Sequence, residues 1–394
     1  MKSEVGTDAS IAASARRRAL KELAWVFLKL GTIAFGGPAA HIAMMDHEIV
    51  RRRRWLTREE FLDLLGATNL IPGPNSTEMA IHIGYRRAGW LGLVVAGTCF
   101  ILPAALIVTV IAWGYVRFGK LPQVERILYA VKPVVIAVVA QALWALGRRS
   151  VKTWTLALAG IAVVVLNFAG VDELVLLFST GVAICLVDGF GNWKKIGACQ
   201  TLCSLFPAKN GIVASAAVGS TAFGLWPLFG FFLKVGSVLF GSGYVLLAFL
   251  RSDLVERWHW LTESQLIDAI AVGQVTPGPV FTTATFIGYV LGGVQGASVA
   301  TLGIFLPAFI FVAISGPLVP RMRQSRIVGA FLDGVIVASM GLMTVVTWQL
   351  ARSAVVDWPT FLLAALSAVL LIRFRVNSAW LILGGAVIGL IVRR

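Results

Sequence analysis

Two Pro-Gly-Pro triplets, Pro72-Gly73-Pro74 and Pro277-Gly278-Pro279, are the parts of this chain best suited to do chemistry. Such a triplet ends one helix, and its second proline suits the first turn of the next. The first N–H groups of a helix have no intrahelical acceptor and carry about half a positive charge, so they bind anions without a dedicated side chain. We therefore expect two helix starts able to hold a compact oxyanion.

Polar side chains surround both predicted breaks. The first new helix starts with Asn75-Ser76-Thr77, and the second carries Thr282 in its first turn. Asn69 and Gln274 precede the two triplets at matching positions and could donate hydrogen bonds to an oxyanion. These residues complete a predicted substrate site around the breaks.

Lys29 and Lys234 each lie in an apolar helix just before a glycine-rich stretch. An ammonium group in a membrane is costly, so it needs a partner or a function. One interpretation is direct help in binding an anion. The alternative is a lysine that reaches the headgroups or pairs with Asp63 or Asp268. Gly36, Gly37, Pro38 and Gly241 belong to these stretches, whose glycines should allow close helix contacts and could also open the backbone to a substrate.

Three acidic residues are candidates for coupling protons to transport: Asp63, Asp268 and Glu78. The two aspartates occupy equal positions in the chain, and structural ion pairs are their alternative role. Glu78 has no acidic counterpart, and its alternative role is to stabilise a helix start. His82 is a weaker candidate for a proton relay.

An internal repeat places these residues in pairs. A shift of 205 aligns residues 29–74 with 234–279, and a shift of 204 continues the match to Leu102-Pro103-Ala104 and Leu306-Pro307-Ala308. The matches include the lysines, Trp55 with Trp260, and both triplets, which chance would not align in one register. The sequence predicts a polar tail (1–20), a first repeat (21–190), a linker (191–225) and a second repeat (226–394).

Composition decides the class of protein. Of the 394 residues, 58% are hydrophobic and 13% charged, whereas a soluble domain carries about 25% charged residues. Residues 88–116 and 269–320 contain no Asp, Glu, Lys or Arg. About 20 apolar residues span a bilayer as a helix. We expect an all-α polytopic membrane protein with about 10–12 membrane segments, and the lipid bilayer as its surroundings.

The triplets also bear on topology. Residues 57–71 and 75–86 should form two half-helices, the first capped by Thr57 and Glu60. Such a broken helix can re-enter the membrane, which leaves about five crossings in each half, and an odd number makes the halves an inverted repeat. The loop after the first helix has five basic residues in the first half and two in the second, which favours a cytoplasmic first loop. Arg16–Arg18 favour the opposite orientation if the first helix crosses the membrane fully, so both orientations stay open. We expect residues 1–15 to be a loose tail.

The pattern Lys-x-Gly-x-x-x-Phe-Gly-Gly-Pro, then Trp-Leu-Thr, Pro-Gly-Pro, Ile-Gly-Tyr and Leu-Pro-Ala resembles the chromate transporter family in its long, two-domain form. The second half departs from it at Ser242-Gly243. The resemblance implies secondary transport of chromate, usually efflux across the bacterial inner membrane, and hence chromate resistance. Sulfate is an isosteric dianion and the alternative substrate.

Other classes fit less well. The net charge of +15 comes largely from short loops, and no nucleic-acid-binding signature accompanies it. No enzyme motif occurs, and the histidines and four cysteines lack metal-ligand spacing, so we expect neither catalysis, nor a metal, nor a cofactor. An anion channel stays open as an alternative to a carrier. A homodimer is possible.

Overall fold

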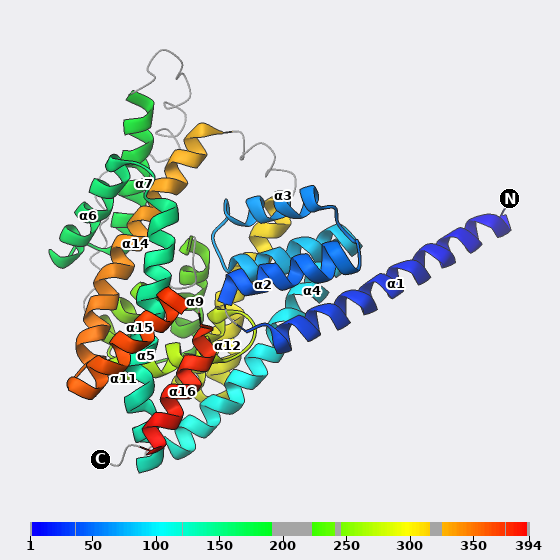
Figure 1. Cartoon of the computed structure of the whole chain (residues 1–394). Helices are drawn as coiled ribbons and strands as arrows, with labels where there is room; N and C mark the ends of the chain where they lie inside the picture. The colour runs from blue at the N-terminus through cyan, green and yellow to red at the C-terminus, as the bar shows by residue number, and fades with distance from the viewer. Residues whose placement is uncertain are drawn as a thin grey trace.

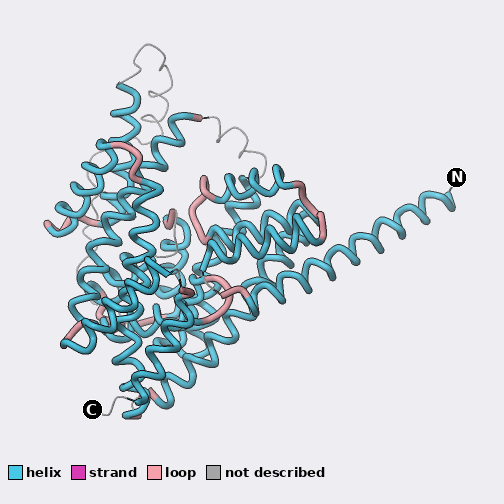
Figure 2. The backbone as a smooth tube through the Cα atoms, in the orientation of Figure 1, coloured by secondary structure: helices cyan, strands magenta, loops and turns pink. Residues whose placement is uncertain are grey.

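The computed structural model describes residues 2–35, 37–119, 121–190, 223–240, 246–315, 325–374 and 376–391. These residues form helices joined by short connections and include no strand (Figure 2). The predicted all-α class is confirmed.

The helices of the second half repeat those of the first (Figure 1). The first half comprises α1 (Lys2–Ile33), α2 (Gly37–Met45), the π-helical η1 (Asp46–Arg52), α3 (Arg58–Thr68), α4 (Asn75–Phe118), α5 (Pro122–Ser150), α6 (Trp154–Phe168) and α7 (Glu173–Phe190). The second comprises α9 (Leu225–Val238), α10 (Leu246–Phe249), the π-helical η3 (Leu250–Arg257), α11 (Glu263–Val275), the short 3-10 turn η4 (Val280–Thr282), α12 (Thr283–Ser315), α14 (Arg326–Ala354), α15 (Trp358–Phe374) and α16 (Ser378–Ile391). Helices α5 and α14, and likewise α6 and α15, start 204 residues apart, so the repeat continues beyond the matching motifs.

Capping residues fix where the short helices begin. The Thr57 hydroxyl accepts from the Glu60 N–H, and the Glu60 carboxylate accepts from the Thr57 N–H. Thr262 and Gln265 form the same reciprocal cap at α11. A capping box satisfies two donors that a helix start leaves unpaired. The predicted cap at Thr57 is confirmed, and both halves start this helix in the same way.

Helices α4 and α12 are each a hairpin of two arms. The backbone leaves helical geometry at Ala88 and Gly89 in α4, where Gly89 has φ +64°. The arm 75–87 folds back along the arm 90–118 so closely that a Cβ on Gly84 would overlap the Gly92 carbonyl. Gly293, at φ +59°, makes the same turn in α12. Glycine adopts this left-handed geometry without strain, and the short first arm agrees with the predicted half-helix 75–86.

The first helix ends in a reversal, and its start differs from the expectation. Helix α1 ends at Ile33, and α2 turns back along it. The His41 Nε2 atom of α2 lies 3.0 Å from the Ala34 carbonyl oxygen, and this contact ties α2 to the end of α1. Gly37, at φ +76°, permits this reversal, so α1 is not a single straight crossing. The expected loose tail (1–15) is wrong, since α1 begins at Lys2 and its alanine-rich start favours helix. This end projects away from the other helices (Figure 1).

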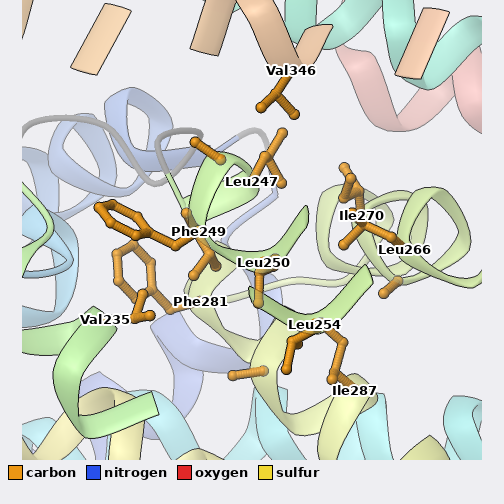
Figure 3. Packing of buried hydrophobic residues seen from close by; sticks show 14 of the residues in the cluster. Val235, Leu247, Phe249, Leu250, Leu254, Leu266, Ile270, Phe281, Ile287 and Val346 are labelled. Carbon is orange, nitrogen blue, oxygen red and sulfur yellow. The ribbon is translucent and has the colours of Figure 1, made fainter. Parts of the chain in front are cut away.

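Apolar side chains pack both inside the protein and over its outer surface. The largest buried cluster joins α9, η3, α11 and α12, with Val235, Phe249, Leu254 and Phe281 among its members (Figure 3). Many large apolar side chains remain exposed, whereas water-soluble proteins rarely expose large apolar patches.

Within the described residues, four helical segments are long and apolar enough to cross a bilayer: Asn75–Phe118, Pro122–Arg148, Val280–Ser315 and Ile327–Ala354. Their apolar surfaces suit lipid. The chain is therefore a multi-pass membrane protein.

The two halves interlock through their later helices. Helix α5 packs against α15 and α16 of the second half, and α14 packs against α6 and α7 of the first. The same exchange occurs between α4 and α12, which pack on each other. Neither half is a separate domain in space, so a site can be built from both.

Candidate anion site

The two Pro-Gly-Pro breaks each bond to the other half of the chain. The Gly73 N–H donates to the Leu239 carbonyl at 2.7 Å, and the Gly278 N–H donates to the Ala34 carbonyl at 2.9 Å. Both the donors and the acceptors are 205 residues apart, so the two bonds are the same contact made twice. Ala34 and Leu239 lie where α1 and α9 end. Four interrupted helices therefore meet at one place, which we call the crossing.

Glycine is required in both triplets. Gly73 has φ +141° and Gly278 has φ +87°, which L-residues rarely adopt. A Cβ on Gly73 would overlap the Glu78 carboxylate, and one on Gly278 would lie 2.6 Å from the Ala104 Cβ. A side chain at either glycine would therefore clash with its neighbours, so the close packing of both breaks requires glycine.

The first helix start at the crossing is that of α4. Pro74 caps the helix, and its carbonyl accepts from the N–H groups of Thr77 and Glu78. The N–H groups of Asn75 and Ser76, in the first turn, have no acceptor within the helix. The Asn75 amide donates to the Asn69 side-chain oxygen at 2.8 Å, so two predicted site residues lie together. Pro72 lies partly buried beside them.

The second helix start is more completely satisfied. The Thr282 hydroxyl donates to the Pro279 carbonyl at 2.8 Å, and the Thr283 hydroxyl donates to the Val280 carbonyl. Pro277, Gly278 and Pro279 are buried, and so is Gln274. The second break is therefore closed to solvent, whereas Asn69, Pro72 and Asn75 leave the first break partly accessible.

Four polar side chains on the first arm of α4 have a buried atom without a hydrogen-bond partner. They are Asn75, through its Oδ1 atom, Thr77, Glu78 and His82, and both carboxylate oxygens of Glu78 lack a partner. Glu78 is 0% exposed and His82 is 3% exposed. The matching positions in the second half, 204 residues later, hold Thr282 and Phe286. The unsatisfied groups therefore belong to the first half.

Each lysine pairs with an acidic residue that the sequence analysis missed. The Lys29 Nζ atom lies 3.9 Å from a Glu48 oxygen, and the Lys234 Nζ atom lies 2.9 Å from an Asp253 oxygen. Both lysine side chains are 40% exposed. The structure thus pairs them with Glu48 and Asp253 in place of the expected Asp63 and Asp268. The shift of 205 relates these two acids also, which is the signal that could have found them.

Glu48 is surrounded by positive charge. The guanidinium groups of Arg53 and Arg52 donate to its carboxylate at 2.9 Å and 3.1 Å. Burial by itself would raise the pKa of Glu48, but the hydrogen bonds from Arg53 and Arg52 and the charge of Lys29 hold that pKa below its ordinary value. The carboxylate is therefore a stable anion that ties α1 to η1.

The two equivalent aspartates have unequal surroundings. Asp268 is 2% exposed, accepts from the Tyr115 hydroxyl at 2.9 Å and lies 3.6 Å from the Lys132 Nζ atom. Asp63 is exposed. Tyr115 and Lys132 belong to the first half, and neither lies in the segments where the sequences of the two halves match. Asp268 thus joins α11 to α4 and α5.

Some predicted features lie outside the described residues: Gly36, Gly241, and nearly all of the linker with Cys199 and Cys203. Gly37 and Pro38 are described and lie partly buried at the start of α2. Within the described part of the chain, no group of three or more His, Cys, Asp and Glu side chains could hold a metal ion.

Comparison with known proteins assigns the family. The family description Chromate transporter matches residues 21–186 and, a second time, residues 226–390. The chain belongs to the chromate transporter family. The two matches cover the two halves, and the crossing is built from both copies of this chromate transporter unit.

Named relatives align along most of their length. The Chromate transport protein of Cupriavidus metallidurans is 34% identical over 382 residues, covering 94% of this chain and 93% of that protein. The Probable chromate transport protein of Synechococcus elongatus is 31% identical, covering 89% of each chain. The Chromate transport protein of Pseudomonas aeruginosa is 32% identical, covering 88% of this chain and 84% of that protein. No solved structure matches this chain.

Proposed function

We propose that this chain is a secondary transporter that carries chromate out of the bacterial cytoplasm across the inner membrane and so confers chromate resistance. The observation that carries the proposal is the crossing, where the Gly73 and Gly278 N–H groups bond to carbonyls at the ends of α9 and α1. It brings two helix starts of a chain from the chromate transporter family to one buried place.

The crossing suits an oxyanion for electrostatic reasons. The first-turn N–H groups of Asn75 and Ser76 point a partial positive charge into a buried region. The unpartnered Thr77 hydroxyl could donate there as well. Lys29 and Lys234, which occupy equivalent positions in the two halves, add positive charge near the ends of α1 and α9. A cation would be repelled by the same groups.

Contacts along α4 support an inverted repeat. Its long arm starts at its own hairpin, passes Gly278 of the crossing at Ala104, and reaches Asp268 of the second half at Tyr115. The long arm of α12 likewise starts at its own hairpin and passes Gly73 at Ala308. Leu93 and Gly97, early in the long arm of α4, lie with Val312 and Phe309, late in the long arm of α12. These contacts favour long arms that run in opposite directions, as expected of halves inserted in opposite directions.

Charge supports an orientation for the first half. The guanidinium groups of Arg53 and Arg87 lie over the Trp55 ring, at 5.3 Å and 4.9 Å from its centroid. At the matching end of the second half, Trp260 stacks on Trp258, with ring centroids 4.6 Å apart. Basic residues concentrate on the cytoplasmic side of membrane proteins. We infer that the end around Trp55 faces the cytoplasm.

Burial of the crossing favours a carrier over a channel. Because both glycines and three of the four prolines of the triplets are buried, an anion can pass only if the breaks separate. Glycine at each break supplies backbone freedom for that movement.

Counterflow in proteoliposomes tests this function. We expect vesicles loaded with unlabelled chromate to accumulate labelled chromate transiently, as a carrier allows and a channel does not. Sulfate is the competitor that ranks the alternative dianion. Lys29→Gln and Lys234→Gln should each raise the half-saturating chromate concentration several-fold, whereas Lys21→Gln, an exposed lysine of α1, should not.

Two results would count against the proposal. Chromate flux without counterflow would indicate an anion channel. The absence of flux for chromate and for sulfate, under either a potential or a pH gradient, would reject oxyanion transport. Unchanged kinetics in both lysine variants would reject their role while the carrier function stands.

A further inference from the structure

A buried aspartate in the first half holds two arginines. Asp46 of η1 pairs with Arg51 of the same element, at 3.2 Å, and with Arg58, the first residue of α3. We call these three residues the first ion cluster. The Asp46 side chain is only 11% exposed, whereas more than half of each arginine side chain is exposed, so the outward face of the cluster is positive.

The second half builds the same cluster with every charge reversed. Arg251 of η3 pairs with Glu256 of the same element and with Glu263, the first residue of α11. These three residues, the second ion cluster, lie 205 positions after the members of the first. The Arg251 side chain is again 11% exposed, and Glu256 is 51% exposed, so the outward face here is negative. The ion pairs of the repeat are kept, and only their signs are exchanged.

Helix stability does not account for the choice of sign. Either polarity joins the π-helix to the next helix, because each cluster places one charge between two opposite ones. A negative side chain in the first turn favours a helix and a positive one opposes its dipole, which suits Glu263 but not Arg58. What the exchange does change is the electric field at each end of the protein.

A positive cavity lies beside the crossing in the first half. It has a volume of about 400 Å³, and its charged lining is Lys29 and Arg52 with Glu48 between them in sequence. Ile33, the last residue of α1, also lines it, and the next residue, Ala34, accepts one of the two hydrogen bonds of the crossing. An anion that enters this cavity therefore arrives directly beside the crossing.

The corresponding cavity of the second half is negative. It has a volume of about 560 Å³, and two members of the second ion cluster line it. Its charged lining comprises two arginines and four acids: Arg251, Arg257, Asp172, Glu173, Asp253 and Glu256. The shift of 205 relates Asp253 and Arg257 to Glu48 and Arg52 of the first cavity, so the two cavities are equivalent. Equivalent cavities thus present opposite charge to a dianion.

We infer that the exchanged charges make the two ends of the carrier unequal toward its substrate, so that a dianion binds with higher affinity from the end of the first half. This inference rests on the proposed oxyanion transport by inverted halves. Positive charge around the first cavity raises the local concentration of a dianion, and negative charge around the second lowers it. The first cavity collects the anion and the second releases it. Unequal affinity does not drive net transport, which needs a gradient across the membrane.

Transport measured separately from each side tests this inference. Right-side-out and inverted membrane vesicles from the same bacterial cells, loaded with unlabelled chromate, present opposite ends of the protein to labelled chromate. In a variant whose only cysteine is Glu59→Cys, a membrane-impermeant maleimide identifies the vesicles that expose the first-half end. At low ionic strength we expect the half-saturating chromate concentration to be several-fold lower at that end than at the other.

Exchanging the charges within a cluster keeps its ion pairs and reverses its field. Arg251→Asp, combined with Glu256→Arg and Glu263→Arg, gives the second half the charges of the first. We expect this triple variant to lower the half-saturating concentration at the second-half end several-fold and to leave the first-half end unchanged. The control exchanges an exposed ion pair without changing its net charge, through Lys152→Asp with Asp333→Lys, and should behave as the wild type.

The reciprocal exchange acts on the other end. Asp46→Arg, combined with Arg51→Glu and Arg58→Glu, should raise the half-saturating concentration at the first-half end several-fold. Equal half-saturating concentrations at the two ends of the wild type would overturn the inference while leaving the proposed function intact. So would unchanged values in both triple variants, as expected of clusters that serve packing or membrane insertion alone.

If the triple variants do not fold, the wild type decides through its dependence on salt. The Debye length falls from about 30 Å at 0.01 M salt to about 8 Å at 0.15 M. The difference between the two ends must therefore shrink as potassium gluconate is added, and a difference independent of salt overturns the inference. A wild type without chromate counterflow in either kind of vesicle would instead reject the proposed function.

Discussion

The charges of this protein are compensated in different ways according to their position. Lys234 and Asp253 form a close pair at the protein surface, and Lys29 shares Glu48 with Arg52 and Arg53. Glu78 has no such partner and lies where the backbone of both halves meets. A paired charge holds two helices together, whereas the Glu78 carboxyl has no partner to hold it in place.

Glu48 gives the protein a specific sensitivity to acid. Because the hydrogen bonds from Arg53 and Arg52 hold its pKa below the ordinary value, its stabilising effect is fully present above the ordinary pKa of glutamate. That effect is lost as the pH falls through the lowered folded-state pKa. We predict that Glu48→Gln lowers the melting temperature at neutral pH but makes it less dependent on pH on the acid side. Thermal unfolding in detergent across that range measures this, with Glu59→Gln as the control. Parallel curves for wild type and Glu48→Gln would contradict it.

Sequence alone found the lysines but not their partners. Lys29 and Lys234 stand out because a charge interrupts an apolar run, whereas Glu48 and Asp253 lie in polar segments where an acid attracts no notice. Likewise, the approach of Tyr115 to Asp268 joins residues 153 positions apart. Such contacts depend on how helices pack, which residue types and spacing do not specify.

At the scale of helices, the breaks were predictable where proline and glycine mark them. Both Pro-Gly-Pro triplets end helices as expected, and Thr57 caps the next one. The sequence marks a glycine-rich stretch after Ile33 but does not specify the reversal that the chain makes there. The reversal depends on Gly37 and on contacts that α2 makes with α1.

The hairpin of α4 depends on glycine at one close approach. A Cβ on Gly84 would overlap the Gly92 carbonyl, so Gly84→Ala must force the two arms apart. We predict a loss of about 1–3 kcal/mol of stability, the usual cost of overpacking, together with loss of transport. Gly114→Ala, farther along the same helix, meets nothing within 4 Å and should be neutral or stabilise by up to about 1 kcal/mol. Thermal unfolding in detergent compares the stability of the two variants. An equal change in stability for Gly84→Ala and Gly114→Ala would show that the hairpin does not depend on the close contact at Gly84.

For the molecule as a whole, the interlocking of the halves has a functional consequence. Each Pro-Gly-Pro break bonds to the other half, and α5 and α14 each pack on helices of the opposite half. A movement that opens one Pro-Gly-Pro break therefore also disturbs the equivalent contact made by the other break. In the proposed carrier with inverted halves, opening on one side and closing on the other would be a single movement, as alternating access requires.

The inverted arrangement predicts which side of the membrane each half's short helix faces. Glu59 and Ser264 occupy the same exposed first-turn position of α3 and α11. In a variant without native cysteines, Glu59→Cys should react with a membrane-impermeant maleimide from the cytoplasmic side, because its end carries the arginines around Trp55. Ser264→Cys should react from the opposite side. Labelling of both after detergent solubilisation controls for accessibility. If intact vesicles labelled both cysteines from one side, the halves would share one orientation, and the two helix starts would not approach the crossing from opposite faces of the membrane.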